Sequence, residues 1–557
     1  MSRLYLQRSV LAKRAWLILF IIISVFYFWG LGAVPLVGPD EPRYAQVARE
    51  MLARRDFITP TLGGLPWFEK PPLLYWMMMV SYRVFGVSEY AARIGPAICG
   101  LITAALIYWT GRAIADAGRD RNSGGGPGIA RWSALAWLSS LGGIGFSRGA
   151  TFDIVLTMTI TGALSCFFVF ETRVRPGREG SRSVNWLLAA FYSFAGLSLL
   201  AKGLIGFVII FGVIGLYFVL RREWPLRPFL LSLIWGVPAS MLLASIWYGP
   251  MLARHGWTFI DQFIIQHHFA RFVSNKFHHP APFYFYLPIL IGLALPWTIV
   301  LGAGLISARR WNWRGQSSLD RARVFALAWL LVPLVFFSFS GSKLAAYILP
   351  ALPAVALLVG ERIACFIGED RGQKVLRLTG TLLIVIVAAA IWYTNRHSDL
   401  KLLTTCLAAL PLMGTAMVAV VRPQLRRHLF VAIVVAVLLT AAIGLRFGGP
   451  AVARTESVRE LLTAAAARGY ATTPVVQLHT VERSAEFYAA GRLSYGSDGE
   501  PLKFEGVVQV LDAARRNGGE VLCFVPVEFA SQLTNAKPAG AQIIGHNGRV
   551  ALVLVRG

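Results

Sequence analysis

Residues 15–37 read AWLILFIIISVFYFWGLGAVPLV and contain no charged side chain. This run exceeds the ~20 apolar residues that a helix needs to cross a bilayer, and it lacks the small-residue cleavage site of a removed signal peptide. The leader is basic, which predicts a cytoplasmic N-terminus; its cations are Arg3, Arg8, Lys13 and Arg14. The next charged stretch, PDEPRY (39–44), therefore emerges on the other side of the membrane.

The composition indicates an integral membrane protein. Of the 557 residues, 56% are hydrophobic and 15% are charged, and the mean hydropathy is +0.58, which excludes an ordinary soluble enzyme. The net charge of +26 does not indicate nucleic-acid binding, because the basic residues gather in short loops between apolar runs, as cytoplasmic loops do. The cysteines lie in apolar runs or alone in the tail, so no disulfide is expected.

Thirteen apolar segments predict an α-helical polytopic membrane protein with about 13 transmembrane helices. They are residues 15–37, 92–111, 129–147, 150–170, 186–201, 204–220, 229–250, 285–307, 322–340, 344–367, 375–394, 400–421 and 428–447. Residues 71–86 are short, begin with two prolines and contain Arg83, so we expect an interfacial or re-entrant segment there. This count places the basic loops in the cytoplasm and the C-terminus outside.

Residues 448–557 change in character. Short apolar strands alternate with helical patterns, which predicts a small α/β domain; the strands are 475–478, 520–525 and 549–555, and the helices are 456–468, 484–490 and 507–516. We therefore expect a transmembrane catalytic domain at 1–447, with a first periplasmic loop at 38–91, and a periplasmic α/β domain at 448–557.

Two carboxylates on the outer side are candidate catalytic groups. Asp40 is placed to cap a helix whose first turn holds Glu41 and Pro42. Apolar residues follow at helical spacing and predict an amphipathic helix on the membrane; they are Tyr44, Val47, Ala48, Met51 and Leu52. Asp40 as a cap alone is the alternative to a catalytic role. Asp153 lies near the outer end of a span, where an acid is a functional candidate by default.

Cations and hydroxyls at the outer ends of the spans suggest one shared polar cavity. Guanidinium, ammonium and phenol groups are suited to a phosphate near the headgroup plane; the candidates are Arg43, Lys70, Lys202, Arg271, Lys343 and Tyr347. Snorkelling to the interface is the alternative for the lysines. Glu69 and His268 are candidate ligands of a divalent ion, zinc, magnesium or manganese. An exposed polar loop is the alternative for the histidines.

Seven short motifs, spread in order over the first 350 residues, carry a family resemblance. They are PDEPRYA (39–45), FEKPP (68–72), the acid Asp153, AKG (201–203), HHFARF (267–272), HPAPFYFYLP (279–288) and GSKLAAYILP (341–350). Together they resemble the membrane glycosyltransferases of the GT-C class, and specifically the 4-amino-4-deoxy-L-arabinose lipid A transferases. The chain departs from that pattern at His267-His268, where the family can have Glu-His.

The resemblance implies a GT-C fold with thirteen transmembrane helices and amphipathic juxtamembrane helices, and an active site facing the periplasm. It implies transfer of aminoarabinose from undecaprenyl phosphate to lipid A phosphates, which lowers affinity for polymyxin and other cationic antimicrobial peptides. By the same resemblance Asp40 acts at the sugar with Asp153 in support. Arg43 and Lys70 are implied to hold the carrier phosphate, and Glu69 with His268 to match a metal site.

The expected partners are the undecaprenyl phosphate-linked sugar donor, lipid A and membrane lipids, without nucleic acid, for a monomer in the bacterial inner membrane. One alternative is another GT-C transferase that uses a polyprenyl-phosphate sugar, such as a protein mannosyltransferase. The other is a polyprenyl-lipid transporter, which would show inverted repeats with broken helices. The sequence shows no such repeats, and its polar residues cluster at one membrane face.

Overall fold

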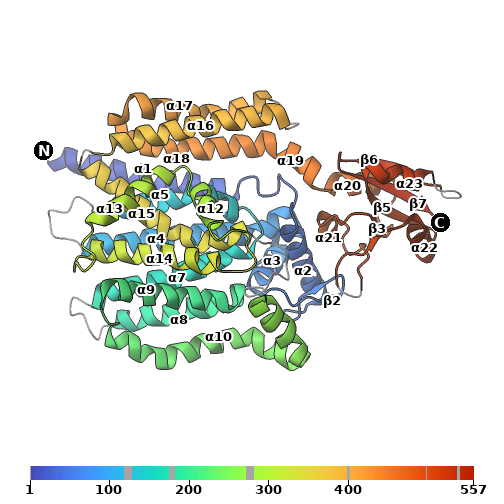
Figure 1. The fold of residues 1–557 in the computed structure, drawn as a ribbon, viewed down its shortest axis with the longest axis horizontal. Coiled ribbons are helices and arrows are strands. Elements are labelled where there is room, and N and C mark those ends of the chain that lie inside the picture. Colours follow the sequence, from blue (N-terminus) through green and yellow to red (C-terminus); the bar gives the residue numbers. More distant parts are fainter. Residues whose placement is uncertain are drawn as a thin grey trace. The chain divides into compact units, whose positions relative to one another are not determined.

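The computed structural model describes residues 2–117, 128–174, 182–270, 281–369, 371–397, 402–496, 499–535 and 540–557. The chain forms two compact units, which Figure 1 draws as ribbons. The first unit comprises residues 1–29, 69–74 and 94–444 and is helical. The second comprises residues 30–68, 75–93 and 445–557 and contains the larger β-sheet.

Each predicted apolar segment overlaps a helix or a pair of helices, although the first predicted span, residues 15–37, is helical only as far as Phe28. The α-helices are α1 (Ser2–Phe28), α4 (Glu89–Ala117), α5 (Gly128–Leu138), α6 (Leu141–Ser147), α7 (Phe152–Val174), α8 (Arg182–Lys202), α9 (Leu204–Arg221), α10 (Arg227–Phe259), α12 (Tyr286–Leu293), α13 (Thr298–Ser307), α14 (Ser318–Ser338), α15 (Leu352–Gly368), α16 (Gln373–His397), α17 (Leu402–Val421) and α18 (Arg426–Ile443). The π-helices are η1 (Ile260–Ala270) and η5 (Gly444–Gly448), and the 3-10 helices are η2 (Ala308–Arg310), η3 (Ala345–Ala351) and η4 (Pro423–Leu425). The predicted α-helical polytopic class is confirmed.

Among the described residues, nine helices are long and apolar enough to cross a membrane, or ten if the bent pair α12–α13 is one span. The predicted span 129–147 is two helices, because the Ser140 hydroxyl accepts a hydrogen bond from Gly143 N (3.0 Å) and starts α6. The predicted span 285–307 bends by 115° between α12 and α13. The number of thirteen crossings stays a prediction, since length and composition alone do not place a bilayer.

α7 is the central helix of the first unit. Its most apolar window is 94% buried, whereas that of α10 is 28% buried. α7 packs against α8, α9 and η3, and the ring of Phe167 contacts aromatic side chains of α8, α9, α10 and α14. Buried aromatic pairs of this kind stabilise helix packing beyond the area they bury. α7 is therefore the element against which the functional ends of its neighbours are positioned.

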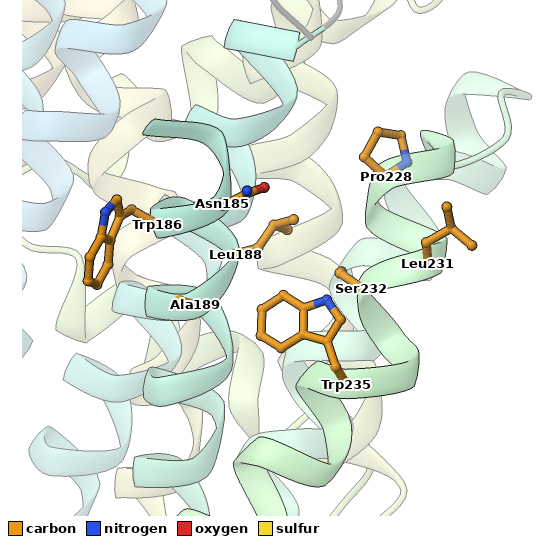
Figure 2. A pocket seen from close by; sticks show the side chains of 8 residues that line it. All are labelled: Asn185, Trp186, Leu188, Ala189, Pro228, Leu231, Ser232 and Trp235. Carbon is orange, nitrogen blue, oxygen red and sulfur yellow. The ribbon is translucent and has the colours of Figure 1, made fainter. Parts of the chain in front are cut away.

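α8 and α10 pack closely at Gly236, where a side chain would collide with the ring of Tyr192. The Tyr192 hydroxyl hydrogen bonds to Ser232 Oγ (2.8 Å). Beside this contact the two helices enclose a groove of about 580 Å³, and Figure 2 shows Leu188 and Trp235 in the space between them. The groove is lined by Asn185, Trp186, Leu188, Ala189, Pro228, Leu231, Ser232 and Trp235.

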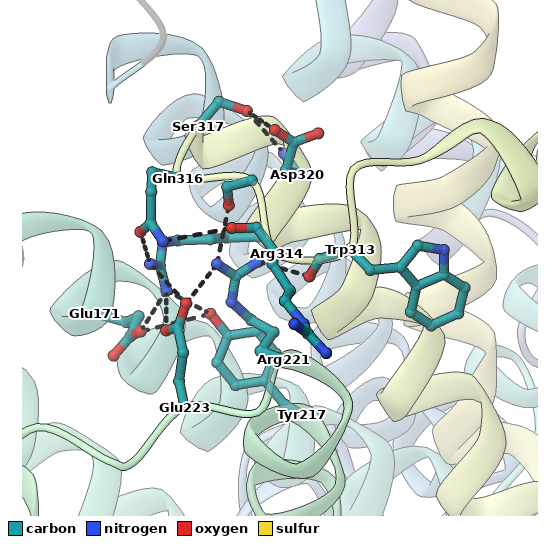
Figure 3. Close-up of polar contacts among 11 residues, drawn as sticks. Glu171, Tyr217, Arg221, Glu223, Trp313, Arg314, Gln316, Ser317 and Asp320 are labelled. Atoms are coloured by element: carbon teal, nitrogen blue, oxygen red, sulfur yellow. Dashed lines mark hydrogen bonds and ion pairs between the residues drawn. The ribbon is translucent and has the colours of Figure 1, made fainter.

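A buried network of charges joins α7, α9 and α14 (Figure 3). Arg321 Nη1 lies 3.2 Å from Glu171 Oε1 and 3.0 Å from Glu223 Oε2. Arg221 Nη2 lies 2.8 Å from Glu223 Oε1 and donates to the carbonyl of Gly315 (2.9 Å). The side chains of Glu171, Arg221 and Arg321 are at most 4% exposed. Each charge in this set is therefore stabilised by its partners rather than by water.

We predict that Arg321→Gln strongly destabilises the helical unit, because it leaves the buried Glu171 carboxylate without this cation. Breaking a buried ion pair costs about 3–5 kcal/mol. Thermal unfolding of the detergent-solubilised chain should show a large fall in melting temperature. The matched control is Arg310→Gln at an exposed arginine, which should change stability by less than about 0.5 kcal/mol. Equal melting temperatures for the two variants would contradict this role for Arg321.

The loop between the first two predicted spans, residues 38–91, contains short elements. Its helices are α2 (Asp40–Arg54) and α3 (Leu73–Phe85), and β1 (Thr61–Leu62) pairs with β2 (Leu65–Pro66) as an antiparallel hairpin. α3 has 13 residues, so at 1.5 Å per residue it is only about 20 Å long. The prediction that residues 71–86 form a segment too short to span agrees with this length.

The tail forms the predicted α/β domain. Its five-stranded sheet has the order β4-β3-β5-β7-β6, in which β4, β3 and β5 are parallel and β7 runs antiparallel to both of its neighbours. The strands are β3 (Val475–Leu478), β4 (Lys503–Phe504), β5 (Glu520–Pro526), β6 (Gln542–His546) and β7 (Val550–Arg556). The helices are α19 (Gly449–Glu456), α20 (Arg459–Ala467), α21 (Ser484–Tyr488), α22 (Val507–Arg516) and α23 (Ala530–Thr534), with the short turn η6 (Val527–Phe529).

The tail helices cover both faces of this sheet. Apolar residues of α20 and α21 pack on one face, against β-strand residues such as Leu522 and Leu554. Residues of α22 and α23 pack on the other face, against Cys523 and Val553. The alternation of inward-facing side chains along β5 and β7 thus fills two separate cores. Figure 1 shows the sheet between these helices.

Candidate functional site

The helix that begins at Asp40 differs from the prediction at its first turn. Asp40 is the first residue of α2, and Pro39 occupies the N-cap position with helical backbone angles and no side-chain cap hydrogen bond. The expectation that Asp40 caps the helix is therefore wrong, because Pro39 already has the α conformation. Asp40 and Glu41 instead place two carboxylates in the first turn, where the helix dipole favours negative charge.

The predicted amphipathic pattern of α2 is confirmed. At the start of the helix, however, polar side chains are buried along with the apolar ones. Tyr44, Val47 and Met51 lie on one face, as the spacing predicts, but they are buried within the protein, and so are Glu41 and Arg43. The reason is that α2 packs against α21 of the tail. Arg49 donates to the carbonyl of Phe487 (2.8 Å) and lies 4.1 Å from its ring centroid. That α2 lies on a membrane stays a prediction.

Glu41 is held by Arg93, a residue that the sequence did not single out. Arg93 Nη2 lies 2.7 Å from Glu41 Oε2, and Arg93 also donates to the carbonyls of Leu31, Val34 and Pro35. One buried guanidinium thus satisfies the backbone of the segment that leads into α2 and neutralises the acid next to Asp40. The only sequence signal was an arginine at the start of an apolar run.

Arg43 is paired with acids of the tail. Its Nε lies 3.5 Å from Glu486 Oε2, its Nη2 lies 3.9 Å from Glu500 Oε2, and its guanidinium lies 5.0 Å from the centroid of the Trp67 ring. Burial raises the pKa of the Glu486 carboxyl above its usual value, while Arg43 and Arg483 act in the opposite direction. Arg43 is predicted to bind phosphate, and the structure gives it a further role in holding α2 to the tail.

We predict that Glu486→Gln destabilises the second unit by about 3 kcal/mol, because it removes a buried acid from between Arg43 and Arg483. The readout is thermal unfolding of the purified full-length chain. Glu456→Gln is the matched control: Glu456 also pairs with an arginine, Arg549, but the pair is exposed, so its loss should cost less than about 1 kcal/mol. If both variants unfold at the same temperature, the contact is not a structural one.

In the first unit, Asp153, Lys202 and Tyr347 come together as a group. Asp153 lies in the first turn of α7, and Lys202 is the last residue of the adjacent helix α8. The Lys202 ammonium forms an ion pair with the Asp153 carboxylate, and it lies 4.4 Å from the centroid of the Tyr347 ring in η3. Both charged side chains are 12–14% exposed. The arrangement supplies an acid, a cation and a phenol at one end of the helical unit.

Lys343, Glu69 and Lys70 also belong to the first unit. Lys343 Nζ donates to the carbonyl of Ser340 (2.7 Å) in the loop that leads to η3. Lys70 Nζ lies 2.7 Å from Glu69 Oε1, and both side chains are 11–13% exposed. An ammonium has three donors, so these contacts engage one donor of Lys343 and at least one of Lys70.

Arg271 and the side chain of His268 lie outside the described residues, so their predicted roles stay predictions. Among the residues that the structure describes, no three His, Cys, Asp or Glu side chains gather as a metal site. Glu69 is the one described candidate ligand, and its carboxylate faces the Lys70 ammonium. The described donors therefore do not by themselves fit a metal centre.

A second arginine, which the sequence placed on the outer side without a role, fixes the end of α1. Arg148, which follows α6, donates to the carbonyls of Phe26 (2.6 Å) and Trp29 (2.7 Å). Carbonyls in the last turn of a helix have no partner within the helix, so this contact stabilises α1 where the chain leaves it. Neither Arg93 nor Arg148 stood in a recognisable motif, so only the tertiary structure identified their partners.

Fold and site together define a polytopic membrane protein of the GT-C type with an α/β tail. A family model described as dolichyl-phosphate-mannose-protein mannosyltransferase matches residues 13–310. The chain belongs to this family.

The chain is also similar to curated bacterial proteins. It is 29% identical over 374 residues to the undecaprenyl phosphate-alpha-4-amino-4-deoxy-L-arabinose arabinosyl transferase of Edwardsiella ictaluri, with 67% of this chain and 63% of the relative covered. The protein of the same name from Pseudomonas aeruginosa is 31% identical over 385 residues, with 68% and 65% covered. The matched part thus spans just under two thirds of the length of these relatives.

Two solved structures share the fold. ArnT from Cupriavidus metallidurans bound to undecaprenyl phosphate matches with a TM-score of 0.77 at 22% identity, covering 97% of this chain and 98% of that chain. The same protein in the apo state gives 0.75 at 23% identity, covering 98% of both chains. The predicted GT-C fold is confirmed, and the coverage includes the α/β tail.

Proposed function

We propose that this chain transfers 4-amino-4-deoxy-L-arabinose from undecaprenyl phosphate to phosphate groups of lipid A, at the periplasmic face of the bacterial inner membrane. The names of its relatives at 29–31% identity support this activity. The single structural observation that carries the proposal is the Asp153–Lys202 ion pair beside Tyr347 at the end of the central helices. Masking lipid A phosphates in this way would lower the affinity of polymyxin and other cationic peptides.

The chemistry requires no strong base. A phosphate monoester has a second pKa near ~6, so at pH 7 the acceptor is already mostly ionised. One acceptor oxygen forms a bond to the anomeric carbon of the sugar, and the bond from that carbon to the carrier oxygen breaks. Undecaprenyl phosphate leaves with the electron pair. The enzyme has to stabilise an oxocarbenium-like sugar and the charge that develops on the leaving phosphate.

The described residues suit these two tasks. Carboxylates near the sugar would stabilise its positive charge, and we assign Asp40 to the sugar or its amino group and Asp153 to support. Ammonium groups at the ends of helices would stabilise the leaving phosphate. We assign Lys70, Lys202 and Lys343 to this role together with Tyr347, Arg43 and Arg271. The ion pair with Asp153 positions the Lys202 ammonium. A phosphate that binds Lys202 therefore competes with the Asp153 carboxylate for this ammonium rather than displacing bulk water.

The further assignments follow the same proposal. The expected topology puts the first loop and the tail in the periplasm, and the protein acts as a monomer with membrane lipids around it. A divalent ion bound by Glu69 and His268 is retained as a proposal without a step assigned to it.

We predict that Asp40→Asn lowers lipid A modification at least about 100-fold, the size of effect seen when one electrostatic group is removed from an active site. The substitution keeps the shape of the side chain. Mass spectrometry of lipid A from an expressing strain that lacks its own transferase gives the readout, with membrane protein levels measured alongside. Asp512→Asn, at an exposed aspartate of α22, is the control and should retain full modification. Normal modification by a normally expressed Asp40 variant would remove Asp40 from the catalytic group.

We predict that Lys70→Ala raises the KM for the lipid donor about tenfold or more, because a charge-assisted hydrogen bond to phosphate contributes roughly 1.5–3 kcal/mol. Initial rates at limiting donor and saturating acceptor measure this change. Lys374→Ala, at an exposed lysine of α16, is the matched control. An unchanged donor KM in the Lys70 variant would exclude Lys70 from the phosphate site.

A protein mannosyltransferase is the second candidate, favoured by the description of the matching family model. The two candidates differ in the acceptor. The same expressing strain separates them, because the sugar would appear on protein rather than on lipid A.

A further inference from the structure

We propose that the groove between α8 and α10 is a binding site for an anionic glycerophospholipid. The apolar part of the groove would hold an acyl chain, and the arginines of the loop between α9 and α10 would hold the phosphate of the headgroup. The groove lies at the end of the helical unit where α8 and α10 begin, opposite the end that carries Lys202. The site is therefore separate from the proposed transfer chemistry.

The lining of the groove suits a lipid tail at the edge of a bilayer. Leu188, Ala189 and Leu231 supply apolar surface, and Trp186 and Trp235 supply amphipathic rings of the kind enriched at membrane interfaces. A cavity of about 580 Å³ is within the usual range for small-molecule sites, roughly 300–1,000 Å³. Figure 2 shows Pro228 and Asn185 near one end of the groove and Trp235 further along it.

The charges beside the groove select an anionic headgroup. Pro228 lines the groove, and the preceding residue, Arg227, is exposed, as is Arg222. Glu223 lies between these arginines in sequence, but its carboxylate is paired with Arg221 and Arg321 in the buried network. Within the described ranges no acidic side chain pairs with Arg222 or Arg227. Arg227 thus adjoins the lining, and the same loop carries a second exposed arginine. Basic pockets between helices are a known mode of recognising acidic lipids.

Away from its contact with α8, α10 is mostly unburied: its most apolar window is 28% buried inside the protein. An apolar helix surface of this kind would face lipid in a bilayer. Apolar contact with lipid tails does not favour one position of α10 relative to α8 over another. A lipid whose headgroup is bound at the loop would favour a single position. A lipid seated between Leu188 and Trp235 would brace α10 against α8 at this end, as the Tyr192–Ser232 hydrogen bond does beside it.

The test uses the purified full-length chain titrated with phosphatidylglycerol or with phosphatidylcholine, and native mass spectrometry counts the bound lipid. We expect the wild type to prefer phosphatidylglycerol and to gain thermal stability from it by mass action. Arg227→Ala should lower the affinity for phosphatidylglycerol about fivefold, the effect of one cation near a lipid surface. It should lower the affinity for phosphatidylcholine by less, because the choline ammonium of that lipid offsets its phosphate charge. Arg310→Ala, at an exposed arginine away from the groove, should retain the preference.

A second variant tests the apolar part independently of the charges. Ala189→Trp fills the groove and should abolish retention of phosphatidylglycerol, whereas Leu242→Trp, at an exposed position of α10 outside the lining, should not. Equal binding of the two lipids by the wild type would overturn the proposal. So would an undiminished preference for phosphatidylglycerol in the Arg227 variant, whatever the behaviour of the Ala189 variant.

Discussion

Pairing of charges at both ends of α7 is the interaction on which the helical unit depends. Asp153 lies in its first turn and Glu171 near its last, which at 1.5 Å per residue places them about 27 Å apart. Each acid meets a cation from another helix, Lys202 of α8 or Arg321 of α14. A buried carboxylate is costly unless it is paired, so these two contacts fix both the rotation and the height of the neighbouring helices about α7.

The ion pairs at the two ends of α7 differ in their surroundings, which suggests a structural role for one and a functional role for the other. Within the Glu171 network the side chains of Glu171, Arg221 and Arg321 are at most 4% exposed, and only the Glu223 carboxylate, at 18%, reaches the surface. Arg221 and Arg321 each have several partners there. The Asp153–Lys202 pair is partly open, and a phenol ring stands against the ammonium. Ionisable groups at membrane depth usually mark functional sites. The Glu171 network thus holds one end of α7 in place. At the other end, Lys202 can exchange the Asp153 carboxylate for another anion without loss of the helix arrangement.

The sequence predicted those features that depend on local pattern. The length of apolar runs located the helices, short apolar runs between helical patterns located β3, β5 and β7, and an acid at the end of a span identified Asp153. Features that depend on distant residues were not accessible. Arg49 and Phe487 are 438 positions apart, and nothing in the loop indicated that Arg43 would meet Glu486 or that Arg93 would bind Glu41. The Asp40 cap was predicted wrongly because the backbone conformation of Pro39 is not encoded in its residue type alone.

The contact of α2 with α21 bears on how proteins of this kind diversify. The first loop and the tail are distant in sequence, yet Arg43 pairs with the buried Glu486 and Arg49 donates to the carbonyl of Phe487. Recombination that exchanged the tail alone between two relatives would leave the buried Arg43 guanidinium without its carboxylate partner. The first loop and the tail therefore have to change together in evolution. The tail is not a module that can be replaced independently of the first loop.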